Sequence, residues 1–438
     1  MKKNLLRNWI FGIISVIAGY LLLVGIVELV DQFYKGTWKT YTYNNSPLSN
    51  YRRNEINTIV TDNQGLVWIG TEEGLYSISP DGIWSTYTSE NSPMVIDRVE
   101  ELVIDKLGNV WVGTYFYLYV FNPNSLNWEK IENISDVRAL TVDNSNQVWV
   151  GTLDGVYVIN DTYDVVENYT SDNSGLVDDE ISVLAIDRFN QVWIGTERDG
   201  ISVYNPDGIW ITYQASDTGL RSNEINCFFF DPHDMVWVGT DYGGLNMLDA
   251  TGNWIQGATK SKYHIYSVAD IVSDNQGNIW VSMGSWGGNI LVNVNGSHSG
   301  GVYTNDNSRL PHYVNTLMVD SNNRLWMGTS YGGLQVIELN EGLPKIAPYN
   351  WVVAREIIRL PMELFIQIVE EIKRYFGYFW YGLIPIIVMF TISGIGFYFG
   401  AKQNSRLGML VSAFIFLITV AFTLFFCNFM FMALFAQG

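Results

Sequence analysis

Short apolar stretches of alternating polarity recur between residues 37 and 340, separated by turns rich in Asp, Asn and Gly. Residues 181–187, 191–196, 200–205 and 209–214 show the pattern within one repeat. Each stretch has the length and two-residue period of a β-strand, and the turn residues between them are those of β-hairpins. The pattern predicts small antiparallel sheets of four strands each.

One phrase is repeated seven times: an aspartate, a tryptophan six residues later, then an aliphatic residue, a glycine and usually a threonine. Successive tryptophans are separated by 43, 38, 44, 44, 43 and 46 residues. A strand-rich repeat of about 40–50 residues is typical of a propeller blade. The sequence therefore predicts an all-β fold, a seven-bladed β-propeller over residues 37–340. The pairs are Asp62/Trp68, Asp105/Trp111, Asp143/Trp149, Asp187/Trp193, Asp231/Trp237, Asp274/Trp280 and Asp320/Trp326.

The first strand of the domain supplies a way to close the ring. The seventh repeat offers only three strands, ending near Glu338, whereas residues 37–43 resemble the fourth strands at 84–89 and 210–215. We therefore expect this N-terminal strand at the outer edge of the seventh blade, completing seven four-stranded blades. Both ends of the domain should then leave from the face that carries the repeated aspartate turns.

The repeated phrase has a structural explanation. An aspartate at the start of a hairpin turn accepts backbone N–H bonds, and a glycine takes the left-handed position of the turn. The tryptophans should fill the space between blades. Because each turn offers a single fixed carboxylate, we predict no metal and no cofactor there.

Three segments have the length and apolarity of membrane spans. Residues 9–30 follow a basic tail at 1–8, which favours a cytoplasmic N-terminus; a cleaved signal peptide is the alternative. Residues 377–400 and 407–435 predict a transmembrane helical hairpin, preceded by an amphipathic juxtamembrane helix at 349–375. We expect a multi-pass protein of the cell membrane with an extracytoplasmic propeller, although basic residues before the second span favour the opposite orientation.

Charge narrows the possible partners. The chain has a formal net charge of −19, and residues 31–340 hold 15 Lys/Arg against 38 Asp/Glu. Such an acidic domain repels phosphate backbones, so nucleic acid is not an expected partner. The two cysteines, Cys227 and Cys427, exclude a disulfide framework.

Candidate binding residues lie on the face opposite the aspartate turns, where loops above a rigid scaffold tend to bind ligands. Polar and aromatic residues occupy the loops between second and third strands: Glu73, Tyr115, Tyr117, Asp154, Arg198, Tyr242, Trp286 and Tyr331. A second group lies five residues before the repeated aspartates, near the mouth of the central channel: Asn57, Glu100, Arg138, Asn226 and Asn315, with Ser182 and Ala269 in the other repeats. The alternatives are rings that cap the blade packing and side chains wetted by channel water.

No catalytic constellation stands out. The four histidines, at 233, 264, 298 and 312, share no metal-ligand spacing and no nucleophile motif. We therefore expect a non-enzymatic protein. A lyase or hydrolase acting on polysaccharide, and a structural or adhesion protein, are the alternatives.

The phrases DNQGLVWIGTEEGLY, DRFNQVWIGTERDG and DSNNRLWMGTSYGGL resemble the two-component regulator propeller repeat. The resemblance covers residues 37–338 and implies an extracytoplasmic sensor region, which in that family often precedes a membrane span and a histidine kinase. No attached kinase is expected here, so a signal would pass to a membrane partner such as a separate kinase. The leading hypothesis is a membrane-anchored recognition module for a glycan or protein ligand.

Overall fold

The computed structural model describes residues 38–48, 55–95, 98–255, 266–283, 291–294, 302–303 and 313–339. These all belong to one compact unit, Lys35–Ile346. Every regular element within them is a β-strand, and none of these residues forms a helix long and apolar enough to span a bilayer. The predicted spans at 9–30, 377–400 and 407–435, the helix at 349–375 and Trp286 lie outside the described residues.

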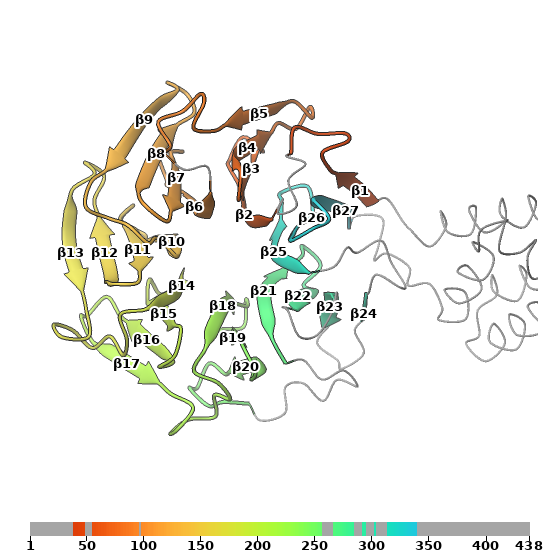
Figure 1. Ribbon diagram of the computed structural model, residues 1–438. Helices are drawn as coiled ribbons and strands as arrows, with labels where there is room; N and C mark the ends of the chain where they lie inside the picture. Colours follow the sequence, from red (N-terminus) through yellow and green to blue (C-terminus); the bar gives the residue numbers. More distant parts are fainter. Residues whose placement is uncertain are drawn as a thin grey trace, which may run out of the picture. The chain divides into compact units, whose positions relative to one another are not determined.

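The strands form seven antiparallel sheets arranged around a centre, which makes this unit an all-β propeller (Figure 1). Six of the sheets have four strands. Three of these are β2 (Ile56–Thr61), β3 (Val67–Thr71), β4 (Gly74–Ile78) and β5 (Trp84–Tyr87); β6 (Val99–Ile104), β7 (Val110–Thr114), β8 (Leu118–Asn122) and β9 (Asn127–Ile131); and β10 (Ala139–Val142), β11 (Val148–Thr152), β12 (Gly155–Ile159) and β13 (Val165–Tyr169). The others are β14 (Ile181–Ile186), β15 (Val192–Thr196), β16 (Ile201–Tyr204) and β17 (Trp210–Tyr213); β21 (Val268–Ser273), β22 (Ile279–Met283), β23 (Leu291–Val294) and β24 (Val302–Tyr303); and β1 (Trp38–Tyr41), β27 (Leu334–Glu338), β26 (Arg324–Thr329) and β25 (Val314–Val319).

The remaining sheet corrects the expectation of seven four-stranded blades. It contains three strands, β18 (Ile225–Phe230), β19 (Val236–Thr240) and β20 (Gly244–Leu248). Where a fourth strand was predicted, the chain makes a single bridge between Trp254 and Leu248, and Ile255 N donates to Met247 O at 2.8 Å. One bridge satisfies too few backbone groups to form a strand. Six four-stranded blades are therefore present among the described residues.

The predicted closure by the N-terminal strand is confirmed. β1 pairs antiparallel with β27, with Trp38 opposite Ile337 and Tyr41 opposite Leu334. The Thr40 hydroxyl donates to Gln335 Oε1 at 2.7 Å across this pair. Arg324 follows an aspartate turn and lies opposite Glu338, at the end of β27. Trp38, at the start of β1, lies opposite Ile337. Both ends of the propeller are therefore at the aspartate-turn face, as predicted.

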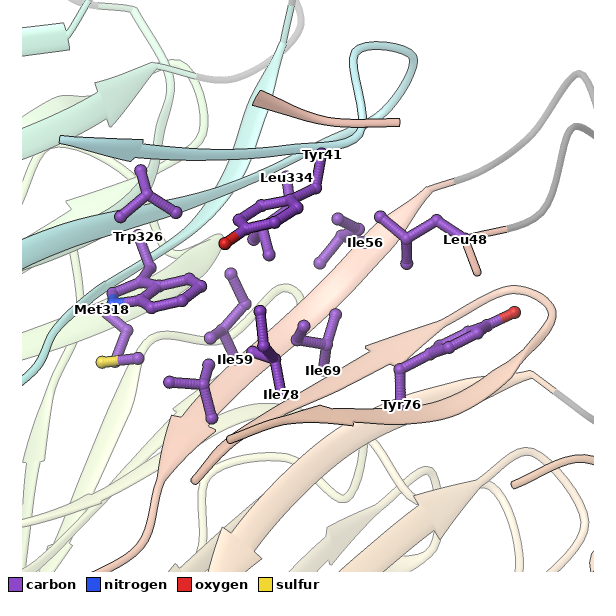
Figure 2. Close-up of a cluster of buried hydrophobic side chains, with 12 residues drawn as sticks. Tyr41, Leu48, Ile56, Ile59, Ile69, Tyr76, Ile78, Met318, Trp326 and Leu334 are labelled. Atoms are coloured by element: carbon purple, nitrogen blue, oxygen red, sulfur yellow. The ribbon is translucent and has the colours of Figure 1, made fainter. Parts of the chain in front are cut away.

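A hydrophobic cluster joins the closing sheet to the first one. Tyr41 and Trp326 come from the sheet of β25–β27 and β1, whereas Ile56 and Ile69 come from β2 and β3. Figure 2 shows these side chains gathered between the two sheets. Tyr41 also makes an edge-on contact with Trp84, with ring centroids 5.3 Å apart. Burial of this apolar surface stabilises the junction where the two ends of the chain's ring meet.

The ring is continuous at its centre. The seven innermost strands, β2, β6, β10, β14, β18, β21 and β25, each contact the next, and β25 contacts β2 (Figure 1). Close packing between neighbours explains the glycine of the repeated phrase. A Cβ on Gly113 would lie 2.5 Å from Val137 Cγ1 of the next sheet, and the sixth repeat carries Ser282 at this position.

The repeated aspartate fixes both the turn and the tryptophan. Asp105 Oδ1 accepts from the backbone N–H groups of Leu107 and Asn109 at 2.9 and 2.8 Å, as predicted. Its Oδ2 accepts from Trp111 Nε1 at 3.0 Å. The same aspartate–indole bond occurs in all seven repeats, between 2.9 and 3.5 Å. The indole N–H can only donate. The spacing of six residues places it against the carboxylate oxygen that the backbone of the turn does not use.

Neighbouring turns are linked to each other. The left-handed residue of the turn is glycine in three repeats and Asn or Asp in four, such as Asn146 with φ 64°. The Asn146 side chain accepts from Lys106 N of the preceding sheet at 2.7 Å. Asn190 accepts from Asn144 N and Asn323 from Asn275 N in the same way. Asparagine here tolerates the backbone conformation and adds a bond that glycine cannot make.

Candidate ligand-binding face

The face opposite the aspartate turns, here called the upper face, is built from the loops between second and third strands and the segments leading into the innermost strands. The threonine of the repeated phrase holds these loops. Thr71 Oγ1 donates to Gly74 O at 3.1 Å and accepts from Glu73 N at 3.0 Å. Equivalent bonds are made by Thr114, Thr152, Thr196 and Thr329. The loop tips are therefore anchored to buried hydroxyls.

Three of the predicted aromatic residues project from these loops. Tyr242 is 65% exposed, Tyr331 70% and Tyr115 44%, and Phe116 beside Tyr115 is equally exposed. Tyr242 also has a φ of 61°, in the left-handed region that an aromatic residue rarely adopts. Such backbone strain is found preferentially at functional sites. The rings offer apolar surface that solvent reaches, on a rigid support.

Two further tyrosines, which were not predicted from the sequence as binding residues, extend this aromatic surface. Tyr266 is 54% exposed, and its carbonyl accepts from Gly244 N in the Tyr242 loop. Tyr313, with φ 60°, contacts the ring of Tyr331 edge-on at 6.3 Å. Tyr313 directly precedes β25 and Tyr266 lies two residues before β21, and this position before an innermost strand is the signal that could have identified them.

A charged cluster lies at the mouth of the channel between the sheets of β2 and β6. Arg98 forms ion pairs with Glu100 at 2.6 Å and with Glu72 at 3.2 Å. Glu55 accepts from Asn315 Nδ2 at 3.1 Å and from Ser330 Oγ at 3.1 Å. Burial raises the pKa of Glu72, Arg98 opposes this, and Glu55 and Glu100 add to it. Glu100 and Asn315 were predicted from the sequence, whereas Arg98, Glu72 and Glu55 were not.

The predicted polar group at the channel mouth ties neighbouring sheets together. Asn57, Asn226 and Asn315 donate through Nδ2 to a main-chain carbonyl of the next innermost strand, at 2.8, 3.0 and 3.3 Å, respectively. Ser182 does the same through its hydroxyl at 2.5 Å. The strand register shifts at each of these four residues, as in a β-bulge, which turns the side chain towards the neighbour. Their role in ligand binding stays a prediction.

The other predicted residues are dispersed over the upper face. Asp154 and Arg198 are exposed at loop tips, and Arg198 pairs with Glu180 at 3.1 Å. Glu73 is half-buried beside Thr71. Tyr117 is covered by Lys130, whose Nζ lies 3.7 Å from the ring centroid. Arg138 opens the third repeat, where its backbone N donates to Gly151 O at 2.9 Å.

The described residues contain no group of three or more His, Cys, Asp or Glu side chains arranged to hold a metal ion. Cys227 is buried, and this burial raises the pKa of its thiol well above the usual range. A thiol in that state is a poor nucleophile. The described part of the upper face thus offers aromatic surface, hydrogen-bonding groups and net negative charge.

These sheets define a β-propeller, and parts of its sequence match a family of propellers. Residues 50–73, 219–242 and 308–331 match the profile of the two component regulator propeller. These three matches support the resemblance that the sequence predicted. No protein of curated function matches it by sequence.

Solved structures share the fold. The extracellular domain of a protein assigned to the hybrid two component systems of B. thetaiotaomicron aligns with a TM-score of 0.60 and 24% identity, over 70% of this chain and 41% of that one. A second such domain from B. thetaiotaomicron aligns with a TM-score of 0.57 and 21% identity, over 68% and 39%. Virginiamycin B lyase from Staphylococcus aureus aligns with a TM-score of 0.57 and 14% identity, over 69% and 99%. The chain therefore spans about two fifths of the two extracellular domains.

Proposed function

We propose that this protein is a membrane-anchored, sensor-like propeller that recognises a glycan or protein ligand with its upper face and performs no chemistry on it. The observation that carries the proposal is the set of exposed tyrosines at Tyr115, Tyr242, Tyr266 and Tyr331, above anchored loops. Aromatic side chains that are held rigidly give contact area at a low cost in conformational entropy. The extracellular domains of two component systems that share this fold support a role in recognition outside the cell.

The proposal includes an arrangement in the cell. The apolar segments at 9–30, 377–400 and 407–435 would anchor the chain in the cell membrane, with the propeller extracytoplasmic and the N-terminus cytoplasmic. Both ends of the propeller leave from the aspartate-turn face, so the segments that lead to the membrane would start there. A signal would then pass through a membrane partner such as a separate kinase.

We also infer that the three-stranded sheet is one of seven blades. β18 stands between β14 and β21 in the inner ring and contacts both, as the innermost strand of a blade would. The bridge at Trp254 occupies the place of the fourth strand. An experimental structure in which these strands belong to another sheet would exclude seven blades.

The binding proposal is tested with the full-length protein in detergent. It would be titrated with soluble cell-envelope oligosaccharides and with solubilised envelope proteins, and binding would be followed by calorimetry. Tyr242→Ala combined with Tyr331→Ala should weaken binding at least about 10-fold, because interface aromatic residues carry much of a binding energy. Phe189→Ala is the matched control, since Phe189 is 57% exposed at the aspartate-turn face. Equal losses in both variants, or turnover of a bound oligosaccharide, would contradict the proposal.

A further inference from the structure

Exposed apolar side chains occur at the aspartate-turn face in four successive blades. The turn before each outer strand lies on this face, because the strands of a blade alternate in direction. The outer strands β5, β9, β13 and β17 follow one another around the ring (Figure 1). The residue that leads into each of them is aliphatic and exposed: Ile83 68%, Leu126 68%, Val165 45% and Ile209 55%.

Two aspartate turns add apolar side chains to the same face. Leu107 is 65% exposed and Phe189 57%. The other five repeats have a polar residue at this position: Gln64, Ser145, His233, Gln276 and Asn322. Cations flank both apolar residues, since Arg188 lies 5.0 Å from the ring centroid of Phe189 and Lys106 directly precedes Leu107. The six exposed apolar residues of this face are called the apolar tips below.

Packing within the propeller does not account for the apolar tips. Each keeps more than two fifths of its surface in solvent, so its burial in the fold contributes little. Leu126 also has a φ of 60°, a left-handed conformation that glycine or asparagine adopts more easily than leucine. Exposed apolar residues that share one face mark an interaction surface, and flanking cations suit the headgroup region of a bilayer.

The length of chain that leaves this face favours the bilayer as its partner. β1 begins at Trp38, and only residues 31–37 separate it from the apolar segment at 9–30. Even when fully extended, this connection reaches about 25–30 Å. A membrane span at 9–30 would therefore keep the start of β1, and with it the aspartate-turn face, within that distance of the hydrocarbon core.

We propose that the apolar tips insert into the interface of the membrane that anchors the chain. The inference rests on the proposed membrane anchoring and adds a lipid-binding surface on the face opposite the ligand-binding one. The repeated aspartates lie on the same face and repel anionic headgroups. The contact therefore depends on burial of apolar surface and should form on phosphatidylcholine alone.

Spin labels on the full-length protein in phosphatidylcholine nanodiscs test the contact. Leu107→Cys and Ile209→Cys would be labelled separately in a protein that carries Cys427→Ser, because the other cysteine, Cys227, is buried. Oxygen partitions into lipid, whereas a nickel chelate stays in water. The ratio of the label's collision rates with oxygen and with the chelate should be at least about 3-fold higher at both sites than at Val95→Cys, which is exposed on the upper face.

Charged substitutions provide a matched comparison. Ile83→Asp combined with Leu126→Asp should lower the ratio at Leu107→Cys to within about 1.5-fold of the Val95→Cys value, because a carboxylate is costly to bury at the interface. Tyr43→Asp is the control, since Tyr43 is 51% exposed beyond the upper end of β1 and should leave the ratio unchanged.

Three outcomes would overturn the proposal. The labels at Leu107→Cys and Ile209→Cys could be as accessible to the chelate as the upper-face label, or the aspartate pair could change nothing. Labels shielded from both reagents would show that a second copy or another protein covers the face. Retention in carbonate-washed membranes tests the anchoring separately: a retained chain with labels in water loses only the lipid contact, whereas a released chain loses both.

Discussion

At the scale of single residues, the aspartate–tryptophan pair is the unit that is repeated. Its turn function could be predicted, because a short carboxylate before a tight turn accepts backbone N–H bonds. The bond to the indole could not be predicted. The spacing alone does not show that the returning strand places Trp111 Nε1 against the second oxygen of Asp105. Likewise, Asn57 was predicted as a binding residue from its position, although it bonds to Val99 O in the next sheet.

We expect Asp105→Ala to destabilise the propeller by about 3 kcal/mol, because a buried indole N–H and two turn N–H groups lose their acceptor. Thermal or urea unfolding would measure the loss. Asp161→Ala is the control, since Asp161 is exposed in the turn between β12 and β13 and should tolerate the change within about 0.5 kcal/mol. Similar losses in the two variants would show that the carboxylate bonds contribute little.

At the scale of elements, the close packing of neighbouring sheets limits which residues fit at the glycine position of the repeated phrase. Gly113→Ala should cost about 1–3 kcal/mol, because the added Cβ would lie 2.5 Å from Val137 Cγ1. Ser282→Ala is the matched comparison, since the sixth repeat already accepts a Cβ at this place. Unfolding midpoints of the two variants would be compared, and a Gly113→Ala protein as stable as Ser282→Ala would refute the packing argument.

The closing strand gives a second prediction at this scale. Deleting residues 1–44 removes β1, exposes the edge of β27 and opens the cluster around Tyr41, so the unfolding temperature of residues 45–340 should fall clearly below that of residues 37–340. Differential scanning calorimetry would measure both unfolding temperatures.

Strand β1 could be predicted because its sequence repeats that of other fourth strands. The sequence did not predict that the described residues after β20 form only one bridge, because Trp254 and Ile255 resemble the start of a strand.

At the scale of the whole molecule, ring closure brings together groups that are remote in sequence. Glu101 and Asp270 were not singled out from the sequence, because each finds its partner in a neighbouring sheet: Thr58 on β2 bonds to Glu101, and Leu317 on β25 bonds to Asp270. No sequence motif marks either residue, and only the folded ring shows these bonds. The binding surface has the same origin, since Tyr313 and Tyr266 gain significance only from the face on which they lie.

Proton linkage follows from this pair. Folded-state pKa values of about 7 and about 6 lie above the ordinary values of 4.5 and 3.8, so the folded protein binds more protons than the unfolded one in this range. With respect to these groups, stability is therefore highest at low pH, falls as pH rises above about 4, and reaches its lowest level above about 7. Unfolding at pH 6.5 should release about one proton from them. Calorimetry in buffers of different ionisation enthalpy would measure it, and proton uptake would contradict the assignment.

The pairing of β1 with β27 also dictates an order of events during synthesis. Thr40 and Gln335 are 295 positions apart, so the earliest part of the propeller to be made waits for the last part before it finds its partner. A ribosome stalled before residue 334 would hold a chain whose first strand has nothing to pair with, and such an unprotected edge invites capture by a chaperone or by another nascent chain. Completion of this ring must therefore wait until residues 334–338 have been made.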